Sequence, residues 1–151
     1  MTIKLKAFDI RNVRKGMIVH GCNAQGVMGS GLAKTIRYTF PEAYRDYRVK
    51  YADEGLNVGD CIISQINSKL FVSNCITQEF YGYDGQVYAS KAGILVSVTK
   101  AFIAAQELGC TSIYMNRIGC IRGGLSWDEE VEPIISRIWL EYPSIRLFVS
   151  K

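Results

Sequence analysis

The residues of greatest chemical interest form a glycine-rich segment, HGCNAQGVMGSGLAK, over positions 20–34. Its glycines are Gly21, Gly26, Gly29 and Gly31, and it follows an apolar run at 17–19. Glycine permits a positive φ and lets a ligand approach the main chain closely. A strand, a glycine-rich loop and a helix start together direct backbone N–H groups toward an anion. The segment therefore predicts a ligand that carries phosphate, although an ordinary strand-to-helix turn explains the same glycines.

The glycine spacing matches neither of two common phosphate-binding patterns. The segment lacks the glycine-lysine ending of a P-loop. Gly26, Gly29 and Gly31 are not spaced as in the GxGxxG loop of dinucleotide-binding folds. A second glycine-bearing segment, over 119–124, precedes another helix-like stretch. Two such loops at one edge of a sheet would hold a pyrophosphate between them.

Composition narrows the class of protein. At 151 residues and 48% hydrophobic residues, we expect a single domain over 1–151 with a substantial core. The net charge of +4 is spread along the chain, which does not predict a nucleic-acid partner. The five cysteines lack metal-ligand spacing and there is one histidine, so we expect reduced thiols, no metal and no cofactor. No signal-peptide or membrane-spanning pattern is visible, so we expect a cytoplasmic protein without a membrane partner.

The apolar periodicity predicts alternating strands and helices. Expected strands cover 3–8, 17–20, 61–66, 70–75, 112–118 and 145–150. Expected helices cover 30–38, 41–54, 88–108 and 126–142. In the last of these, Ser126 and Glu129 have the form of a capping box, and Pro133 should delay or kink the helix. The order predicts an α/β fold with a mixed, largely parallel central sheet covered on both faces.

Several short segments in a fixed order make the chain recognisable. They are FDI at 8–10, IVHGCN at 18–23, QGVMGSGLA at 25–33, FPEAYRDY at 40–47, Asn74, Gln78, YG at 81–82, RIGC at 117–120, GG at 123–124 and Trp127. Together they span nearly the whole chain and resemble a macro domain, the ADP-ribose-binding module. The resemblance is to the branch of ADP-ribose 1''-phosphate phosphatases and terminal ADP-ribose glycohydrolases. It implies a macro-domain-like three-layer α/β/α sandwich, with ADP-ribose, ADP-ribose 1''-phosphate or an ADP-ribosylated protein as partner.

The resemblance also assigns roles to residues. Asp9 falls where an acid accepts a hydrogen bond from the adenine amine, and the backbone N–H of Ile10 would reach a ring nitrogen. Without the resemblance, Asp9 is interpreted as a turn acid after a strand. Asn23 falls where the family holds the distal ribose, and an amide both donates to and accepts from a diol. The residues expected to bind ligand are Phe8, Asp9, Ile10, Gly21, Cys22, Asn23, Val27, Met28, Gly29, Ser30, Gly31, Leu32, Ala33, Asn74, Gln78, Ile118, Gly119, Cys120, Ile121, Arg122, Gly123, Gly124 and Leu125.

The chain departs from the family pattern at informative positions. Gln78 stands where the glycohydrolases carry a lysine nucleophile, and Gly123 stands where some of them carry an acid. Both departures oppose lysine-dependent removal of ADP-ribose. Arg122 is unusual in the second glycine segment, where it would either clamp a phosphate or point to solvent. Ile121 beside it would narrow the diphosphate slot.

The candidate catalytic residues are His20, Asn23 and Asp84. His20 would act as a general acid or base, or it is a core histidine beneath the loop. Asp84 would act as a base, or it belongs to an ordinary Asp-Gly turn. Cys22 and Cys120 would be nucleophiles only with a lowered pKa. The sequence leaves open a phosphatase acting on ADP-ribose 1''-phosphate, a non-catalytic reader of ADP-ribose and, more weakly, a hydrolase or deacylase that uses a substrate-aligned water.

Overall fold

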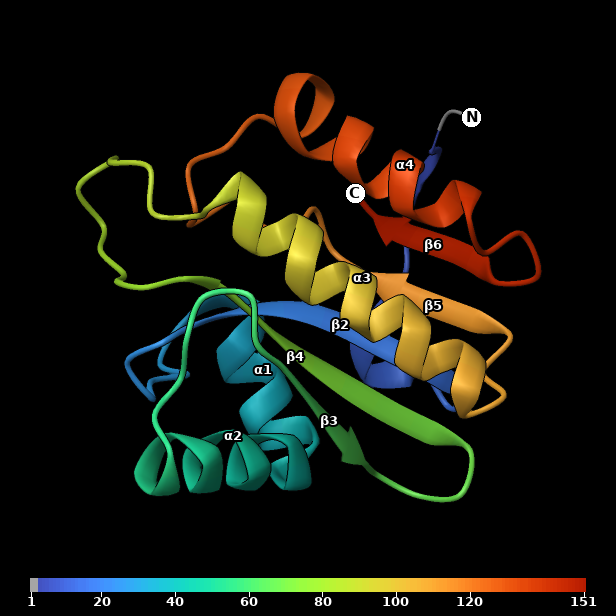
Figure 1. The fold of residues 1–151 in the computed structure, drawn as a ribbon, viewed down its shortest axis with the longest axis horizontal. Helices are drawn as coiled ribbons and strands as arrows, with labels where there is room; N and C mark the ends of the chain where they lie inside the picture. Colours follow the sequence, from blue (N-terminus) through green and yellow to red (C-terminus); the bar gives the residue numbers. More distant parts are fainter. Residues whose placement is uncertain (1–2) are drawn as a thin grey trace.

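The computed structural model describes residues 3–151, which form one sheet covered by helices (Figure 1). Its strands are β1 (Leu5–Lys6), β2 (Gly16–Asn23), β3 (Cys61–Gln65), β4 (Leu70–Gln78), β5 (Ser112–Met115) and β6 (Arg146–Ser150). Its helices are α1 (Gly31–Thr39), α2 (Pro41–Asp53), α3 (Lys91–Glu107) and α4 (Glu132–Leu140). A 3-10 turn η1 (Ile10–Asn12) follows β1, and a π-helical turn η2 (Trp127–Val131) precedes α4.

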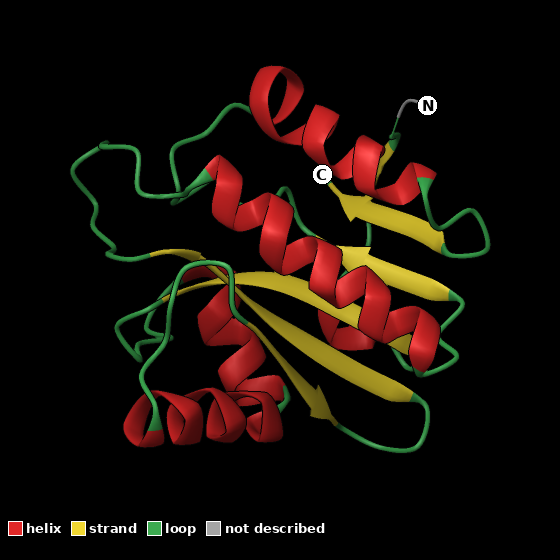
Figure 2. Ribbon diagram, viewed as in Figure 1, coloured by secondary structure: helices red, strands yellow, loops and turns green. Residues whose placement is uncertain are grey.

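The sheet is mixed and largely parallel, as predicted. Its strands, yellow in Figure 2, have the order β1-β6-β5-β2-β4-β3. The pair β3–β4 is antiparallel, and the other pairs are parallel. The carboxyl ends of β5, β2 and β4 therefore meet at one edge of the sheet, where ligands bind in folds of this kind.

Strand β2 shows how the sequence builds two cores. Successive side chains of a strand point to opposite faces of the sheet. Met17 and Val19 belong to one core cluster, which also contains residues of α3 and α4. Ile18, between them, belongs to a second cluster with Ile36 of α1 and Ala43 of α2. The predicted arrangement of three layers is confirmed, with α3 and α4 on one face and α1 and α2 on the other.

Most element boundaries lie within a few residues of the predicted ones, and the largest differences have local causes. Strand β4 continues to Gln78, because it stays paired with β2 up to Asn23. Helix α3 begins at Lys91 and not at 88, because the Ser90 side chain accepts a hydrogen bond from the N–H of Gly93 at 3.0 Å and caps the helix. The expected strand over 3–8 is reduced to the short β1.

The start of the last helix combines two predicted features in an altered form. The Ser126 hydroxyl accepts from the N–H of Glu129 at 3.3 Å, as in a capping box. The reciprocal bond comes from Glu130, whose carboxylate accepts from the N–H of Ser126 at 2.8 Å. The π-helical turn explains this shift, because it contains one more residue than an α-helical turn. Pro133 then lies in the first turn of α4, directly after the π-helical turn.

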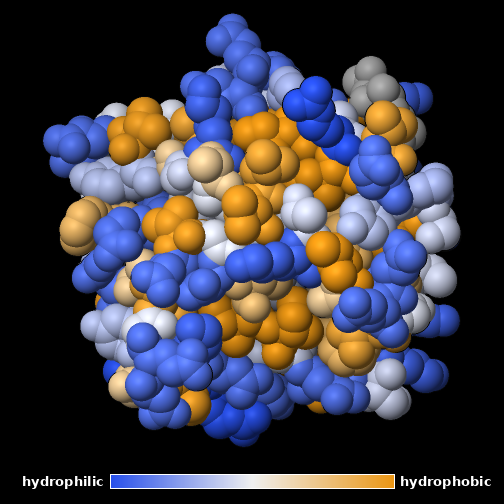
Figure 3. All heavy atoms as spheres, in the orientation of Figure 1, coloured by the Kyte–Doolittle hydropathy of each residue, from blue (hydrophilic) through white to orange (hydrophobic). Residues whose placement is uncertain are grey.

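The surface over α3 and α4 carries both apolar and polar side chains. Apolar and polar side chains alternate over this face (Figure 3), and Leu95, Val96 and Ile103 of α3 are exposed. Among the helices of residues 3–151, none is long and apolar enough to span a bilayer.

At the β1–β6 edge, Lys6 and Arg146 lie over the Phe148 ring at 5.5 and 5.1 Å from its centroid.

Candidate functional site

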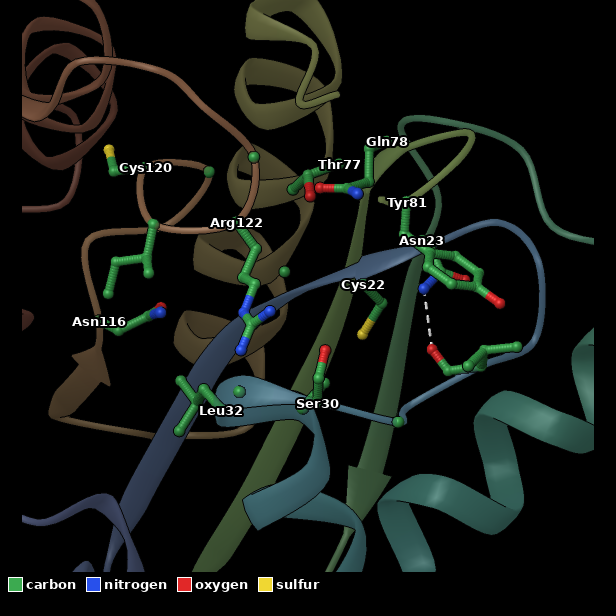
Figure 4. A pocket seen from close by; sticks show the side chains of 18 of the residues that line it. Cys22, Asn23, Ser30, Leu32, Thr77, Gln78, Tyr81, Asn116, Cys120 and Arg122 are labelled. Atoms are coloured by element: carbon green, nitrogen blue, oxygen red, sulfur yellow. Dashed lines mark hydrogen bonds between the residues drawn. The ribbon is translucent and has the colours of Figure 1, made fainter. Parts of the chain in front are cut away.

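A pocket of about 260 Å³ lies at the carboxyl ends of β5, β2 and β4 (Figure 4). This volume lies just below the usual range for small-molecule sites, which is about 300–1,000 Å³. Its walls are the end of β2 with the first loop (24–30), the first turn of α1, the segment 77–83 and the second loop (116–125). Both glycine segments singled out in the sequence therefore face the same space.

Asn23 organises the first loop. Its amide donates to the carbonyl of Val27 at 2.8 Å, and its Oδ1 accepts from the N–H of Gln25 at 2.9 Å. From α2, the hydroxyl of Tyr47 donates to the main-chain oxygen of Asn23 at 2.6 Å, and Arg48 donates to the carbonyl of Gly26 at 2.9 Å. Asn23 lines the pocket while its amide holds the loop, so its predicted contact with a ribose would add to these bonds.

Gly123 holds the second loop against the start of α3. Its carbonyl accepts from the N–H groups of Tyr88 and Ala89 at 2.9 and 3.1 Å. A Cβ at this position would collide with the carbonyl oxygen of Gly119 and lie 2.7 Å from the Cβ of Ala89. Gly119 and Gly124 have positive φ values of 77° and 85°, which glycine adopts without strain. The backbone thus excludes any side chain at position 123, including the acid that the family resemblance would place there.

Many of the residues predicted to bind ligand line this pocket, and others do not. Those that line it are Gly21, Cys22, Asn23, Val27, Gly29, Ser30, Gly31, Leu32, Ala33, Gln78, Gly119, Cys120, Ile121, Arg122 and Gly123. Within the described chain, the predicted residues outside its lining are Phe8, Asp9, Ile10, Met28, Asn74, Ile118, Gly124 and Leu125. The pocket therefore covers the expected diphosphate and distal ribose region but not the expected adenine contacts at 8–10.

His20 lies beneath the pocket and not in it. Its side chain is wholly buried, and its Nε2 lies 2.6 Å from Oδ1 of Asn74, its partner in the β2–β4 register. The Asn74 amide in turn donates to the carbonyl of Ile62 at 3.1 Å. Burial lowers the pKa of His20 to about 4, against the opposing effect of the Asn74 hydrogen bond. An enclosed, neutral imidazole cannot exchange protons with a ligand, so the geometry supports the core-histidine interpretation for His20 and a structural position for Asn74.

The other candidate catalytic residues, Asp84, Cys22 and Cys120, are also poorly placed or poorly ionised for catalysis. Asp84 accepts from the hydroxyl of Tyr88 at 2.7 Å and from the N–H of Gln86 at 3.2 Å, and these bonds lower the pKa of its carboxyl. It does not line the pocket, so it fastens its own turn. Burial raises the pKa of the Cys22 thiol, and it raises the pKa of Cys120 to about 11. Neither thiol is a ready nucleophile near neutral pH.

The Asp9 carboxylate is hydrogen-bonded within its own loop. Its Oδ1 accepts from the N–H of Arg11 at 2.9 Å, which caps η1. The Arg11 guanidinium binds both carboxylate oxygens at 2.6–3.0 Å. The hydrogen bonds from Arg11 lower the pKa of Asp9. An adenine amine would therefore share this carboxylate with Arg11, and that contact stays a prediction.

Sequence reasoning missed several pocket residues, namely Thr77, Tyr81, Gly82, Tyr83, Asn116 and Arg117. The most informative is Asn116, just beyond β5, whose side chain extends toward the side of the pocket on which Arg122 lies (Figure 4). Its Oδ1 is buried and has no hydrogen-bond partner. Its place between a strand and the second loop was the available signal. Among the described residues, no group of three histidine, cysteine or acidic side chains is arranged to hold a metal ion.

The fold and the pocket define an α/β module that presents two glycine loops to a ligand. The sequence pattern of the Macro domain matches residues 19–134, and the chain belongs to the macro domain family. None of the curated proteins matches this chain.

Solved structures agree with this assignment of the fold. The macrodomain of Mycobacterium tuberculosis DarG is 19% identical, with a TM-score of 0.85 over 98% of this chain and 96% of that one. A macrodomain protein from Streptomyces coelicolor is 26% identical, with a TM-score of 0.75 over 93% and 90%. Thermosipho africanus DarTG in complex with ADP-ribose is 21% identical, with a TM-score of 0.78 over 99% of this chain and 43% of that one.

Proposed function

We propose that this macro domain binds ADP-ribose and removes the terminal phosphate of ADP-ribose 1''-phosphate. Support for the ligand comes from the paired glycine loops and from the relative that was solved in complex with ADP-ribose. The reaction adds the oxygen of a water molecule to phosphorus and breaks the bond between phosphorus and the oxygen on the ribose anomeric carbon. That oxygen takes a proton, and the products are inorganic phosphate and ADP-ribose.

The observation that carries the proposal is the charge of the pocket wall. Arg117 and Arg122 line the pocket, and within the described residues no aspartate, glutamate or histidine does so. A wall with cations and without carboxylates suits a substrate that carries a diphosphate and a terminal phosphate. Such a site accelerates hydrolysis by orienting water and by stabilising charge on the phosphoryl oxygens. Thr77, Gln78 and Asn23 are among the polar side chains in the wall that are able to orient a water molecule.

Two positions speak against the glycohydrolase reaction. The amide of Gln78 is not a nucleophile, and it donates to the carbonyl of Phe80 at 2.6 Å. The backbone around Gly123 leaves no room for an acidic side chain. A lysine-dependent covalent route therefore lacks both of its reactive groups here.

A non-catalytic reader of ADP-ribose is the second candidate. It is favoured by the same absence of a general acid or base from the pocket wall, taken over residues 3–151. A reader would bind ADP-ribose and ADP-ribose 1''-phosphate without releasing phosphate.

One experiment separates these functions. The protein is incubated with ADP-ribose 1''-phosphate, released phosphate is measured, and ADP-ribose binding is followed by calorimetry. Phosphate release that is lost in Arg117→Gln supports the phosphatase. Micromolar binding without phosphate release supports the reader, and absence of binding to either nucleotide contradicts both.

A further inference from the structure

Three segments meet across the mouth of the pocket through Tyr83. Its hydroxyl donates to Oγ of Ser30 in the first loop at 2.8 Å. Its ring receives the guanidinium of Arg122, from the second loop, at 4.7 Å from the centroid. We call Ser30, Tyr83 and Arg122 the strap. Tyr83 is 66% exposed, so the strap lies at the surface and not in the core.

The strap separates two hollows of the surface. The pocket lies on one side, and a second, more open hollow lies on the other. Gly82, Tyr83, Ile121 and Arg122 line both. A change in the Tyr83–Arg122 contact would therefore open the pocket sideways into this second hollow.

Arg122 has a charge without an acidic partner. None of the ion pairs within residues 3–151 includes it, and its recorded contact is the Tyr83 ring. The guanidinium extends into the pocket between the second loop and the start of α1 (Figure 4). Its Nε would lie 3.8 Å from a Cβ at Gly31, the first residue of α1. Arg122 thus reaches the point where the first loop passes into the helix.

The start of α1 also lacks a capping side chain. Ser30 is the N-cap residue, yet its side chain makes no capping hydrogen bond and instead accepts from Tyr83. The first N–H groups of α1 therefore lack a side-chain acceptor, and they carry the positive end of the helix dipole. An anion placed here would receive main-chain N–H bonds on one side and the Arg122 fork on the other.

We infer that Arg122 is a specificity-determining residue that binds the diphosphate of the ligand and is held ready by the ring of Tyr83. This inference rests on the proposed ADP-ribose ligand. An exposed cation–ring contact is weaker than a bidentate pair of guanidinium and phosphate. The ring keeps the Arg122 side chain over the pocket, so the guanidinium loses less conformational freedom when it binds the diphosphate, and it stays over the ring in the complex.

The test compares the binding of three ligands to two variants that each lose one positive charge. Binding of ADP-ribose, ADP and adenosine is measured by calorimetry for the parent, Arg122→Gln and Arg45→Gln. Arg45 lies on α2 with its side chain 69% exposed, so its replacement removes the same charge away from the pocket. We expect Arg122→Gln to weaken ADP-ribose and ADP by about tenfold, to leave adenosine unchanged and to reduce the salt dependence of binding. Arg45→Gln should bind all three as the parent does.

Two variants of Tyr83 test the role of the ring. Tyr83→Phe keeps the ring and loses the bond to Ser30, so its affinity for ADP should stay within about twofold of the parent. Tyr83→Leu loses the ring and should weaken ADP by about threefold in the parent background but not in Arg122→Gln. Equal effects of Tyr83→Leu in both backgrounds would overturn the coupling.

The outcomes separate this inference from the proposed function. Unchanged ADP-ribose binding in Arg122→Gln overturns the inference and leaves the function standing. Loss of adenosine binding in that variant, or loss confined to ADP-ribose 1''-phosphate, also overturns it. If the parent binds ADP through Arg122 but does not bind ADP-ribose, the inference stands and the proposed ligand fails. A parent that binds neither nucleotide overturns both.

Discussion

Asn116 offers a test in which stability and binding should change in opposite directions. Its Oδ1 is buried in the pocket wall without a hydrogen-bond partner. A buried acceptor without a donor costs free energy of folding, and a bound ligand with a hydroxyl or amine donor would recover that cost. We therefore consider Asn116→Leu, which keeps the branched shape of the side chain and removes its polar atoms.

The size of both effects follows from the state of this one oxygen. An unsatisfied buried polar group costs about 1–3 kcal/mol, and its removal with preserved shape is neutral or stabilising. Taking the lower end, we expect a gain of about 1 kcal/mol in unfolding free energy, or about 2–4 °C in Tm for a domain of this size. Loss of a ligand hydrogen bond of about 1 kcal/mol should weaken ADP-ribose about fivefold.

Ser64 provides the matched control. Its Oγ is the other buried side-chain oxygen recorded without a partner among residues 3–151, and it lies in β3 outside the pocket wall. Ser64→Ala should also raise the unfolding free energy but leave ADP-ribose binding unchanged. The measurements are urea denaturation and calorimetry. Unchanged ADP-ribose binding in Asn116→Leu together with lower stability would refute the reasoning, since the amide would then serve the fold alone.

Further predictions concern the loops and the buried histidine. In Gly29→Glu the new side chain would meet Val27 at an ordinary 3.4 Å, so the protein should fold while ADP-ribose affinity, measured by calorimetry, falls at least ~10-fold by charge repulsion; an unchanged Kd would contradict the first loop as a phosphate site. Gly123→Asp should lower the unfolding free energy by about 3 kcal/mol or more in urea denaturation, because its Cβ has no room, and it should create no glycohydrolase activity. His20 has a pKa lowered from 6.5 to about 4, so between these pH values the unfolded state binds more protons than the folded state. The contribution of His20 to the unfolding free energy is therefore complete above pH 6.5 and falls by up to roughly 3 kcal/mol as the pH drops toward 4. Denaturation curves of His20→Leu should show a smaller loss over this range, and an equal loss would contradict the assignment.

The sequence was most informative where local chemistry decides the structure. The two glycine segments, the helix start at Pro41 and the apolar run at 17–19 in β2 each depend on near neighbours in the chain, and each was predicted. Pro133 also acted locally, because a proline fits only the first turn of the helix that follows it.

Long-range register decided what the sequence left open. The environment of His20 depends on its pairing with Asn74 in a strand more than fifty residues away, and no local pattern reports that register. The partner of Asp9 is only two residues distant, yet their pairing depends on the η1 turn that brings the Arg11 side chain back. Tyr83 and Asn116 reach the pocket because segments after β4 and β5 converge there, which requires the sheet order.

The short β1 strand has a consequence for how the molecule behaves at high concentration. It covers only Val149 and Ser150 of β6, so within the described chain Arg146–Phe148 has no strand on that side. An uncovered edge invites cross-chain β-pairing and aggregation. Lys6 and Arg146, both over Phe148, place two cations at this edge, and a second copy would bring two more beside them. Electrostatic repulsion between these cations therefore opposes edge-to-edge association of two copies, and this repulsion should weaken as salt is added.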